Sequence, residues 1–201
     1  ADRTALVVAQ AARLAAWRTH GAGGHFVTRE PTVTELRGLY RPQSVAEATA
    51  LLAQDPEARA MSGGATLVAM INAGVIEPAG LVSLDCIEEI KGISLLADGR
   101  VRIGAFTRHR ETAECRIELG EAGVVRHAAS QIANATVRNM GTIGGSISFA
   151  DPGLDYPPAL VAANALIEIA STTGRRTVPA AEFFVDWYTT AVQPGEIVTA
   201  V

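Results

Sequence analysis

The chain has 201 residues, of which 48% are hydrophobic and 19% are charged. This balance allows a sizeable core and excludes a largely disordered chain. The apolar runs are short, whereas a membrane-spanning helix needs about 18 or more consecutive apolar residues, so the sequence predicts no membrane span. The net charge is −4, and no stretch supplies the basic stripe that is typical of nucleic-acid-binding proteins.

The cysteine count and the first residues indicate the compartment. Two cysteines, Cys86 and Cys115, are too few for a disulfide-rich secreted scaffold. They also cannot hold an iron–sulfur cluster alone, because such clusters take about four protein ligands. Charged residues interrupt the stretch where a secretory signal would be apolar, namely Asp2, Arg3 and Arg13. We therefore expect a cytoplasmic protein with reduced thiols.

Residues 1–38 form a leader to which the sequence assigns no role. Apolar residues near a helical period predict that its first 20 residues are helical, namely Leu6, Val7, Ala11, Leu14 and Trp17. The segment 39–92 follows and is predicted to be a small βαβ lobe. Ser44 with Glu47 three residues later is a capping box. The expected elements are a helix over 45–54, a strand over 59–61, a helix over 66–73 and a strand over 81–84.

From residue 93 the apolar period changes to two, which predicts strands. Asp98-Gly99 lies between two such runs and predicts a hairpin. Thr107 is expected to cap a helix that runs to about Cys115. The later elements are expected to be helices over 121–133, 157–163 and 180–184 and strands over 165–170, 176–178 and 196–201. The fold class is therefore α+β, with a mainly antiparallel second lobe that carries helices over residues 93–201.

The first of two glycine-rich segments lies between a predicted strand and a predicted helix. It reads Ser62-Gly63-Gly64-Ala65-Thr66-Leu67. Glycines let the backbone approach a ligand closely, and successive free N–H groups that lead into a helix form a site for an anion. A plain strand-to-helix turn has the same spacing, so the spacing leaves both interpretations open.

The second segment lies in the stretch 136–155, which is dense in glycine and polar residues and is expected to be a loop. It reads Asn139-Met140-Gly141-Thr142-Ile143-Gly144-Gly145-Ser146, and Asp151 and Asp155 follow it. A loop that approaches a ligand closely, followed by carboxylates, fits a pyrophosphate and a ribose. The alternative is an irregular loop with an Asp-Pro turn. Neither segment has the spacing of a Rossmann glycine motif or of a P-loop.

The remaining polar residues indicate no metal site and no catalytic triad. The histidines share no metal-ligand spacing and have no accompanying cysteine pair. His109 and His127 are interpreted as surface residues or as helix residues with satisfied hydrogen bonds.

The order of these segments resembles the FAD-binding (medium) subunit of the molybdenum hydroxylase family, which includes xanthine dehydrogenase and carbon monoxide dehydrogenase. The resemblance covers about residues 40–201. Its main elements are Tyr40-Arg41-Pro42-Gln43-Ser44, the segment 62–67, the segment from Arg138 to Ser146 and the segment from Ala150 to Asp155. Shorter matches are 103–107, 183–184, 190–191 and 194–196. Ala65 and Ser146 depart from the family pattern, which has polar residues and Asn there.

The resemblance implies the bilobal FAD-binding fold of the vanillyl-alcohol-oxidase (PCMH) type, with noncovalent FAD between the lobes. It assigns the pyrophosphate to the two glycine segments, a ribose hydroxyl to Asp155 and the neighbourhood of the isoalloxazine to Thr107 and Tyr188. The implied cofactor-site residues are Ser62, Gly63, Gly64, Ala65, Thr66, Leu67, Thr107, Asn139, Thr142, Gly144, Gly145, Ser146, Asp155 and Tyr188.

The implied function is that of the flavoprotein subunit of a multi-subunit molybdenum-dependent dehydrogenase. Electrons would pass from [2Fe–2S] clusters on a small subunit through FAD to an external acceptor, while the molybdenum cofactor resides on a large subunit. No residue of this chain is expected to be catalytic, because the cofactor supplies the redox chemistry. The family pattern continues into a C-terminal domain that we expect to be absent from these 201 residues.

Two alternatives remain open at this point. One is a self-contained flavin oxidase or reductase of the same fold. The other is a flavin-free assembly module, which Ala65 and the expected absence of the C-terminal domain motivate. The sequence names neither the oxidised substrate of the complex nor its electron acceptor.

Overall fold

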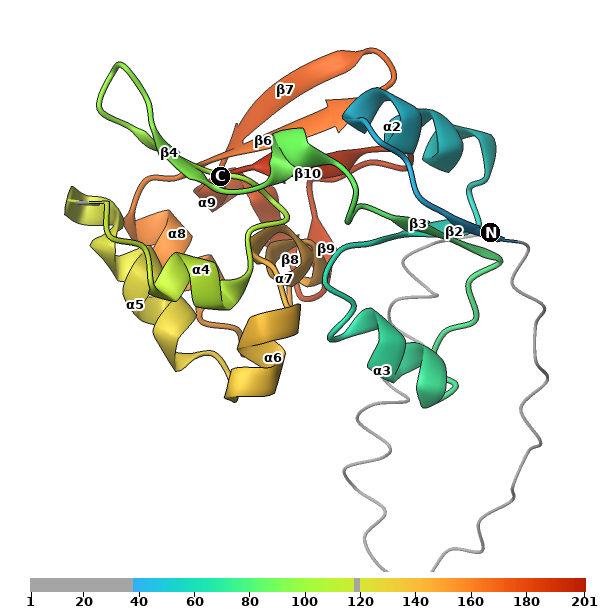
Figure 1. Cartoon of the computed structure of the whole chain (residues 1–201), viewed down its shortest axis with the longest axis horizontal. Coiled ribbons are helices and arrows are strands. Elements are labelled where there is room, and N and C mark those ends of the chain that lie inside the picture. Colours follow the sequence, from blue (N-terminus) through green and yellow to red (C-terminus); the bar gives the residue numbers. More distant parts are fainter. Residues whose placement is uncertain (1–37, 118–119) are drawn as a thin grey trace, which may run out of the picture.

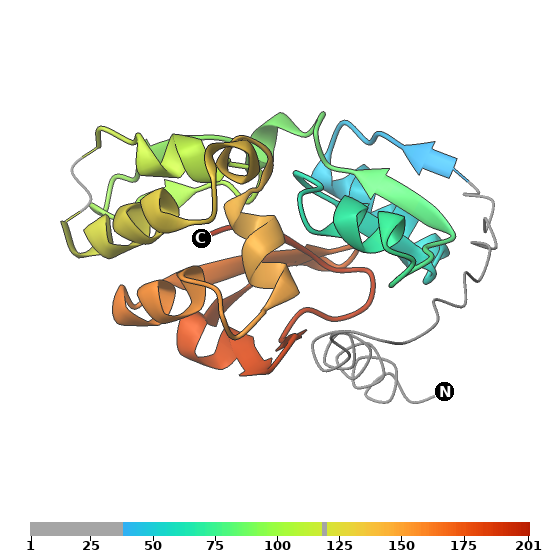
Figure 2. The same ribbon diagram turned by 90° about the horizontal axis from the view of Figure 1, so that it is seen from below.

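The computed structural model of the chain describes residues 38–117 and 120–201, which form the mixed helix and strand fold that the sequence predicts (Figure 1). The helix predicted within the first 20 residues and the rest of the leader before Gly38 lie outside these ranges. Figures 1 and 2 show the segment 38–90 on one side of the molecule and the helices of residues 109–140 on the other. Helix α7 (Ile143–Phe149) lies between them.

The predicted βαβ unit is present. It consists of β2 (Ala58–Met61), α3 (Leu67–Asn72) and β3 (Gly80–Ser83). Because β2 and β3 pair directly in parallel, α3 is the crossover between them. A third strand, β1 (Gly38–Tyr40), pairs in parallel with the other edge of β3. The sequence analysis missed β1, because three residues are too few to show a period of two.

Helix α2 (Val45–Gln54) begins where the capping box predicts. The Ser44 hydroxyl accepts the Glu47 N–H at 3.2 Å, and the Glu47 carboxylate accepts the Gln43 N–H at 2.8 Å. The first bond satisfies an N–H group that a helix start otherwise leaves open, and the second joins the residue before the N-cap to the first turn. The buried face of α2 consists of Val45, Ala48, Thr49 and Leu52.

The second sheet is antiparallel, with strand order β10-β6-β7. Two hairpins accompany it, and the hairpin predicted at Asp98-Gly99 is one of them, with Gly99 at φ +85°. The strands are β4 (Ile93–Leu95), β5 (Val101–Ile103), β6 (Leu166–Ser171), β7 (Gly174–Pro179), β8 (Phe184–Asp186), β9 (Thr189–Thr190) and β10 (Ile197–Ala200).

The remaining helices are short and lie mainly between β5 and β6. They are η1 (Glu88–Ile90), α4 (His109–Ala113), η2 (Gly120–Ala122), α5 (Gly123–Gln131), α6 (Ala135–Met140), α8 (Tyr156–Ala162) and α9 (Ala180–Phe183).

Two predictions about this helical region are wrong. The stretch expected to be a loop contains α6 and α7, whose first turns are capped by the side chains of Asn134 and Thr142. Glycines within α7 hid its helical pattern. Thr107 does not cap α4: the N-cap is Arg108, and the Thr107 hydroxyl instead donates to the Gly92 carbonyl at 3.0 Å.

The apolar core has two clusters. The first lies among α5, α7, α8 and the antiparallel sheet, and its fully buried members include Ile143, Tyr156 and Phe183. The second joins α2 and the parallel sheet to residues of the predicted second lobe, namely Phe106, Ala170 and Ile197. The two predicted lobes therefore share apolar core residues, and the division at residues 92 and 93 stays a prediction.

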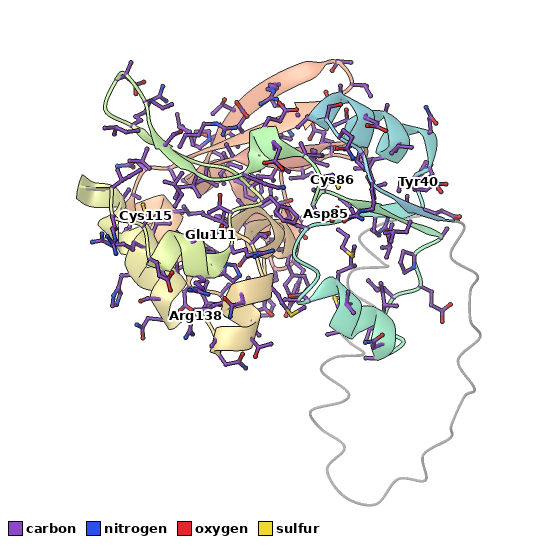
Figure 3. All side chains as sticks on the ribbon, viewed as in Figure 1. Tyr40, Asp85, Cys86, Glu111, Cys115 and Arg138 are labelled. Carbon is purple, nitrogen blue, oxygen red and sulfur yellow. The ribbon has the colours of Figure 1, made fainter. Side chains whose placement is uncertain are left out.

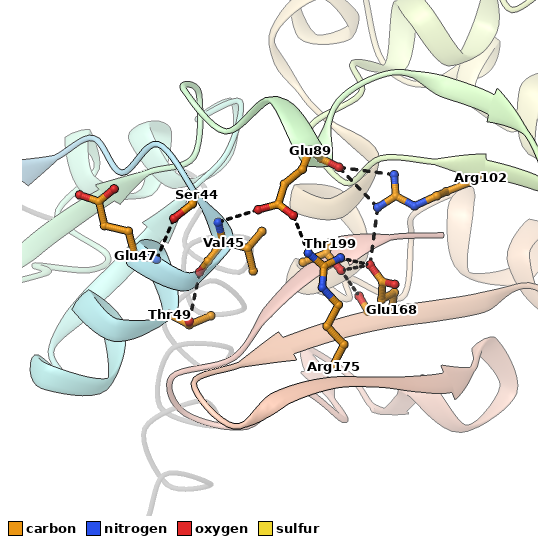
Figure 4. Close-up of polar contacts among 9 residues, drawn as sticks. All are labelled: Ser44, Val45, Glu47, Thr49, Glu89, Arg102, Glu168, Arg175 and Thr199. Carbon is orange, nitrogen blue, oxygen red and sulfur yellow. Dashed lines mark hydrogen bonds and ion pairs between the residues drawn. The ribbon is translucent and has the colours of Figure 1, made fainter.

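A polar network reinforces the same junction (Figure 4). The Glu89 carboxylate accepts the Val45 N–H at the start of α2 at 3.0 Å and the Arg175 guanidinium at 2.6 Å. Arg175 also donates to Glu168 at 2.7 Å, and the Thr199 hydroxyl donates to the same carboxylate at 2.6 Å. Burial opposes the charge of Glu168, but the bonds from Thr199 and Arg175 outweigh it and lower the Glu168 pKa.

Candidate functional site

The two glycine-rich segments, 80 residues apart in sequence, lie against each other. The Ser62 and Thr142 hydroxyls are 2.7 Å apart and share a hydrogen bond. A Cβ atom on Gly63 would lie 1.7 Å from the Met140 carbonyl oxygen, so only glycine allows this approach. The fold therefore brings together the two segments that the sequence singled out.

The first segment offers unused hydrogen-bond donors. Gly64 adopts φ +76°, a left-handed conformation that favours glycine. Within residues 38–117 and 120–201, no acceptor takes the backbone N–H groups of the run Gly63, Gly64, Ala65 and Thr66. Successive free amides of this kind suit an anion such as a phosphate. The Leu67 side chain is half-buried at the start of α3.

The second segment differs, because its amides in the first turn of α7 are already used. Thr142 is the N-cap of α7, and its hydroxyl accepts the Gly145 N–H at 3.1 Å. The N–H groups of Ile143, Gly144 and Ser146 donate to Thr107 O, Ala105 O and Thr142 O at 3.0, 2.9 and 3.0 Å. A Cβ on Gly144 would lie 2.6 Å from the Ala105 Cβ. Close packing therefore requires glycine at residue 144, and the half-buried Ser146 hydroxyl has no hydrogen-bond partner among the residues that the structure describes.

The carboxylates after α7 have different surroundings. Asp151 accepts the Gly153 N–H at 2.8 Å and the Tyr188 hydroxyl at 3.0 Å. Tyr188 adopts φ +55°, and its N–H donates to the Ala150 carbonyl at 2.8 Å. A bulky residue whose backbone is held in this left-handed conformation is strained, and such residues cluster at functional sites. Asp155 is exposed and directly precedes α8.

The other predicted cofactor residues occupy contrasting positions. Thr107 is 1% exposed, and its hydroxyl is bonded within the protein. Asn139 is exposed at the end of α6, and its side-chain oxygen is 3.5 Å from the Arg110 guanidinium. The structure therefore leaves Asn139 open to a ligand and encloses Thr107.

His109 is a residue whose importance the sequence did not indicate. It is buried at the start of α4, and its Nδ1 is 3.2 Å from the Tyr156 hydroxyl. Burial lowers the pKa of His109 to about 4, so the imidazole is neutral at neutral pH. Burial also raises the pKa of Tyr156, which keeps its proton. A histidine beside a helix cap carries no spacing signal that would have predicted this pair.

Other titratable groups form no second site in the part of the chain that the structure describes. No group of three or more His, Cys, Asp or Glu side chains there could hold a metal ion. Cys86 and Cys115 are both free and lie on opposite sides of the molecule (Figure 3). Arg41 hydrogen-bonds Asp85 and holds the pKa of that carboxyl at about 2.

A run of amides that no described residue accepts, beside a second glycine segment, is typical of domains that bind a phosphate-containing cofactor. The family model described as "FAD binding domain in molybdopterin dehydrogenase" matches residues 33–201, and the chain belongs to this family. The family predicted from the sequence is thereby confirmed.

Two curated relatives illustrate the match. The glyceraldehyde dehydrogenase medium chain of Sulfolobus acidocaldarius is 36% identical over 161 residues, which cover 80% of this chain and 57% of the relative. The carbon monoxide dehydrogenase medium chain of Hydrogenophaga pseudoflava is 35% identical over 163 residues, which cover 81% and 56%. The chain thus spans a little over half the length of these relatives.

Solved structures agree with the sequence comparison. Carbon monoxide dehydrogenase from Hydrogenophaga pseudoflava superimposes with a TM-score of 0.78 at 35% identity. Quinoline 2-oxidoreductase from Pseudomonas putida 86 superimposes with a TM-score of 0.76 at 30% identity. Each match covers 81% of this chain and 57% of the other. The α+β fold is therefore that of an established group of oxidoreductase subunits.

Proposed function

We propose that the two glycine segments hold the pyrophosphate of noncovalently bound FAD. The observation that carries this proposal is the run of unused amides from Gly63 to Thr66, next to the Ser62–Thr142 junction. Neutral N–H donors suit a pyrophosphate, because several of them share its charge without a lysine. The Ser146 hydroxyl adds a donor from the second segment.

The roles proposed for the other residues follow from their positions. Asp155 is exposed and free to accept the hydroxyls of a ribose, whereas Asp151 already accepts two hydrogen bonds. Tyr188, held by Asp151, is proposed to lie beside the isoalloxazine, and Asn139 to border it. Thr107 and Thr142 support the site from within, because both hydroxyls are bonded inside the protein.

We propose further that the protein is the flavoprotein subunit of a molybdenum-dependent dehydrogenase. When bound, FAD accepts electrons and delivers them to an external acceptor. The partners would be a small iron–sulfur subunit and a large molybdenum subunit, and the complex would be cytoplasmic. The medium-chain names of the relatives support this role. The structure adds only that no helix in its described part has the length and apolarity to cross a membrane.

The first experiment is an FAD titration of the purified full chain. We expect it to retain absorption bands near about 370 and 450 nm after excess flavin is removed. Gly64→Val should abolish retention, because a branched side chain is strained at φ +76° and meets Val68. Gly99→Val is the matched control: it has the same strain at φ +85° in the distant β4–β5 hairpin.

Each outcome of these experiments distinguishes the proposed function from an alternative function. A wild-type chain that stays colourless and apo overturns FAD binding and favours a flavin-free assembly module. Equal flavin retention by Gly64→Val and the wild-type chain overturns the assignment of the first segment. Turnover of a small alcohol or aldehyde by the lone chain would favour a self-contained oxidase over a subunit that passes electrons.

A further inference from the structure

The buried His109 imidazole lies between the second glycine segment and the first residue of α8. On one side, a Cβ on Gly141 would be 2.5 Å from the His109 Nε2, so the backbone of the second glycine segment packs closely against the ring. On the other side, Nδ1 hydrogen-bonds the hydroxyl of Tyr156, which directly follows Asp155. The ring centroids of His109 and Tyr156 are 5.4 Å apart.

The backbone around His109 is joined to the same glycine segment. The His109 N–H donates to the Gly141 carbonyl at 3.0 Å, and the Ile143 N–H donates to the Thr107 carbonyl at 3.0 Å. These bonds form an antiparallel bridge between Arg108 and Thr142. Residues 107–109 therefore act as a short strand against which residues 141–143 are held.

The chemistry of the pair suits a fixed contact. A neutral imidazole has one nitrogen that accepts and one that donates. A protonated tyrosine hydroxyl can either donate a hydrogen bond to Nδ1 or accept one from it. Both side chains are buried, with Tyr156 at 0% and His109 at 4% exposure. A buried hydrogen bond of this kind is costly to break, because the remaining partner stays without water. The pair thus fixes the spacing between Gly141 and the start of α8.

We propose that His109 is a positioning residue for the cofactor: through Gly141 and Tyr156 it sets the spacing of Thr142 and Ser146 relative to Asp155. This inference rests on the FAD site proposed above. Substitution of His109 should therefore weaken FAD binding, although the His109 side chain itself is not proposed to contact the cofactor.

The test compares FAD dissociation constants and the visible circular dichroism of bound flavin in the full chain. His109→Leu and Tyr156→Phe remove the same hydrogen bond, so each should raise the dissociation constant about fivefold to tenfold. The double variant should be no weaker than the weaker single variant, because the two residues act as one unit. His109→Asn, whose amide can take the place of Nδ1, should recover part of the affinity. All measurements are made well below each variant's melting temperature.

Leu52→Ala in α2 is the control for lost stability, because Leu52 is buried in the other core cluster. It should lower the melting temperature and leave both the dissociation constant and the flavin dichroism unchanged. Unchanged FAD affinity and dichroism in His109→Leu would overturn the inference, provided that Gly64→Val abolishes binding. Additive losses in the double variant would also count against it. A wild-type chain without FAD affinity overturns the proposed function and this inference together.

Discussion

The hydroxyls of Ser62 and Thr142 meet at 2.7 Å and join the turn after β2 to the first turn of α7. Thr142 serves two purposes, because the same hydroxyl oxygen also caps α7 by accepting the Gly145 N–H. The junction therefore couples the start of a helix to the loop that carries the free amides. A change at Thr142 should affect both stability and cofactor binding.

Thr142→Val should lower the free energy of unfolding by about 1–2 kcal/mol, because α7 loses its N-cap and Ser62 loses its partner. It should also weaken FAD binding, since the two segments are no longer joined. Urea unfolding and an FAD titration measure the two effects.

Thr142→Ser keeps the hydroxyl and should behave nearly as the wild type. Thr136→Val, on an exposed position of α6, controls for the valine itself and should change stability by less than about 0.5 kcal/mol. Equal stability of Thr142→Val and Thr136→Val would contradict the capping role.

Local signals in the sequence predict much of the fold. The capping box at Ser44 and Glu47 gives the start of α2, and Asp98-Gly99 gives the first hairpin, because both depend on neighbouring residues alone. β1 escapes prediction because it is stabilised by pairing with β3, more than 40 residues away in sequence.

The candidate site is predictable as two segments but not as one geometry. A glycine that packs against Ala105, as Gly144 does, has the same sequence pattern as a glycine that approaches a ligand. The use of the α7 amides by Thr107 and Ala105 is likewise a tertiary contact. A single sequence carries no signal that distinguishes the free amides of one segment from the bonded amides of the other.

Gly144→Ala should destabilise the protein by about 1–3 kcal/mol, because its new methyl group would overlap Ala105 backbone and side-chain atoms that cannot rotate away. Gly123→Ala is the matched control: Gly123 begins α5, and among the described residues no atom outside its chain neighbours and its own helix backbone lies within 4 Å of the added carbon. Its melting temperature should stay the same or rise slightly, since alanine favours a helix. A Gly144→Ala protein as stable as the control would show that α7 can move away from Ala105.

The Glu89 network predicts a loss of stability at the junction of α2 with β7. Glu89→Ala should lower the free energy of unfolding by about 1 kcal/mol, because the Val45 N–H and Arg175 both lose an acceptor. Glu88→Ala removes an exposed ion pair with Lys91 and should have no measurable effect. Chemical unfolding of both variants at low and high salt measures the difference. Identical unfolding curves would show that the shared apolar core alone holds the junction.

The buried imidazole of His109 predicts a specific dependence of stability on pH. Its folded pKa of about 4 lies below the ordinary histidine value of 6.5, so between these values the unfolded chain binds a proton that the folded protein does not. Stability from this group should therefore be complete above about pH 6.5 and fall as the pH approaches 4, by about 3 kcal/mol at most. Asp85, with its pKa lowered to about 2 from 3.8, adds a loss at lower pH.

Chemical unfolding of the wild type, His109→Gln and His127→Gln at intervals between pH 7 and 4.5 measures this effect. His109→Gln should be less stable at pH 7 but should lose less stability on acidification, because glutamine takes up no proton. His127 is exposed on α5, so His127→Gln should follow the wild-type curve. If the wild-type and His109→Gln curves stay parallel over this range, the imidazole titrates alike in the folded and unfolded chain, and its burial does not govern the acid sensitivity of the fold.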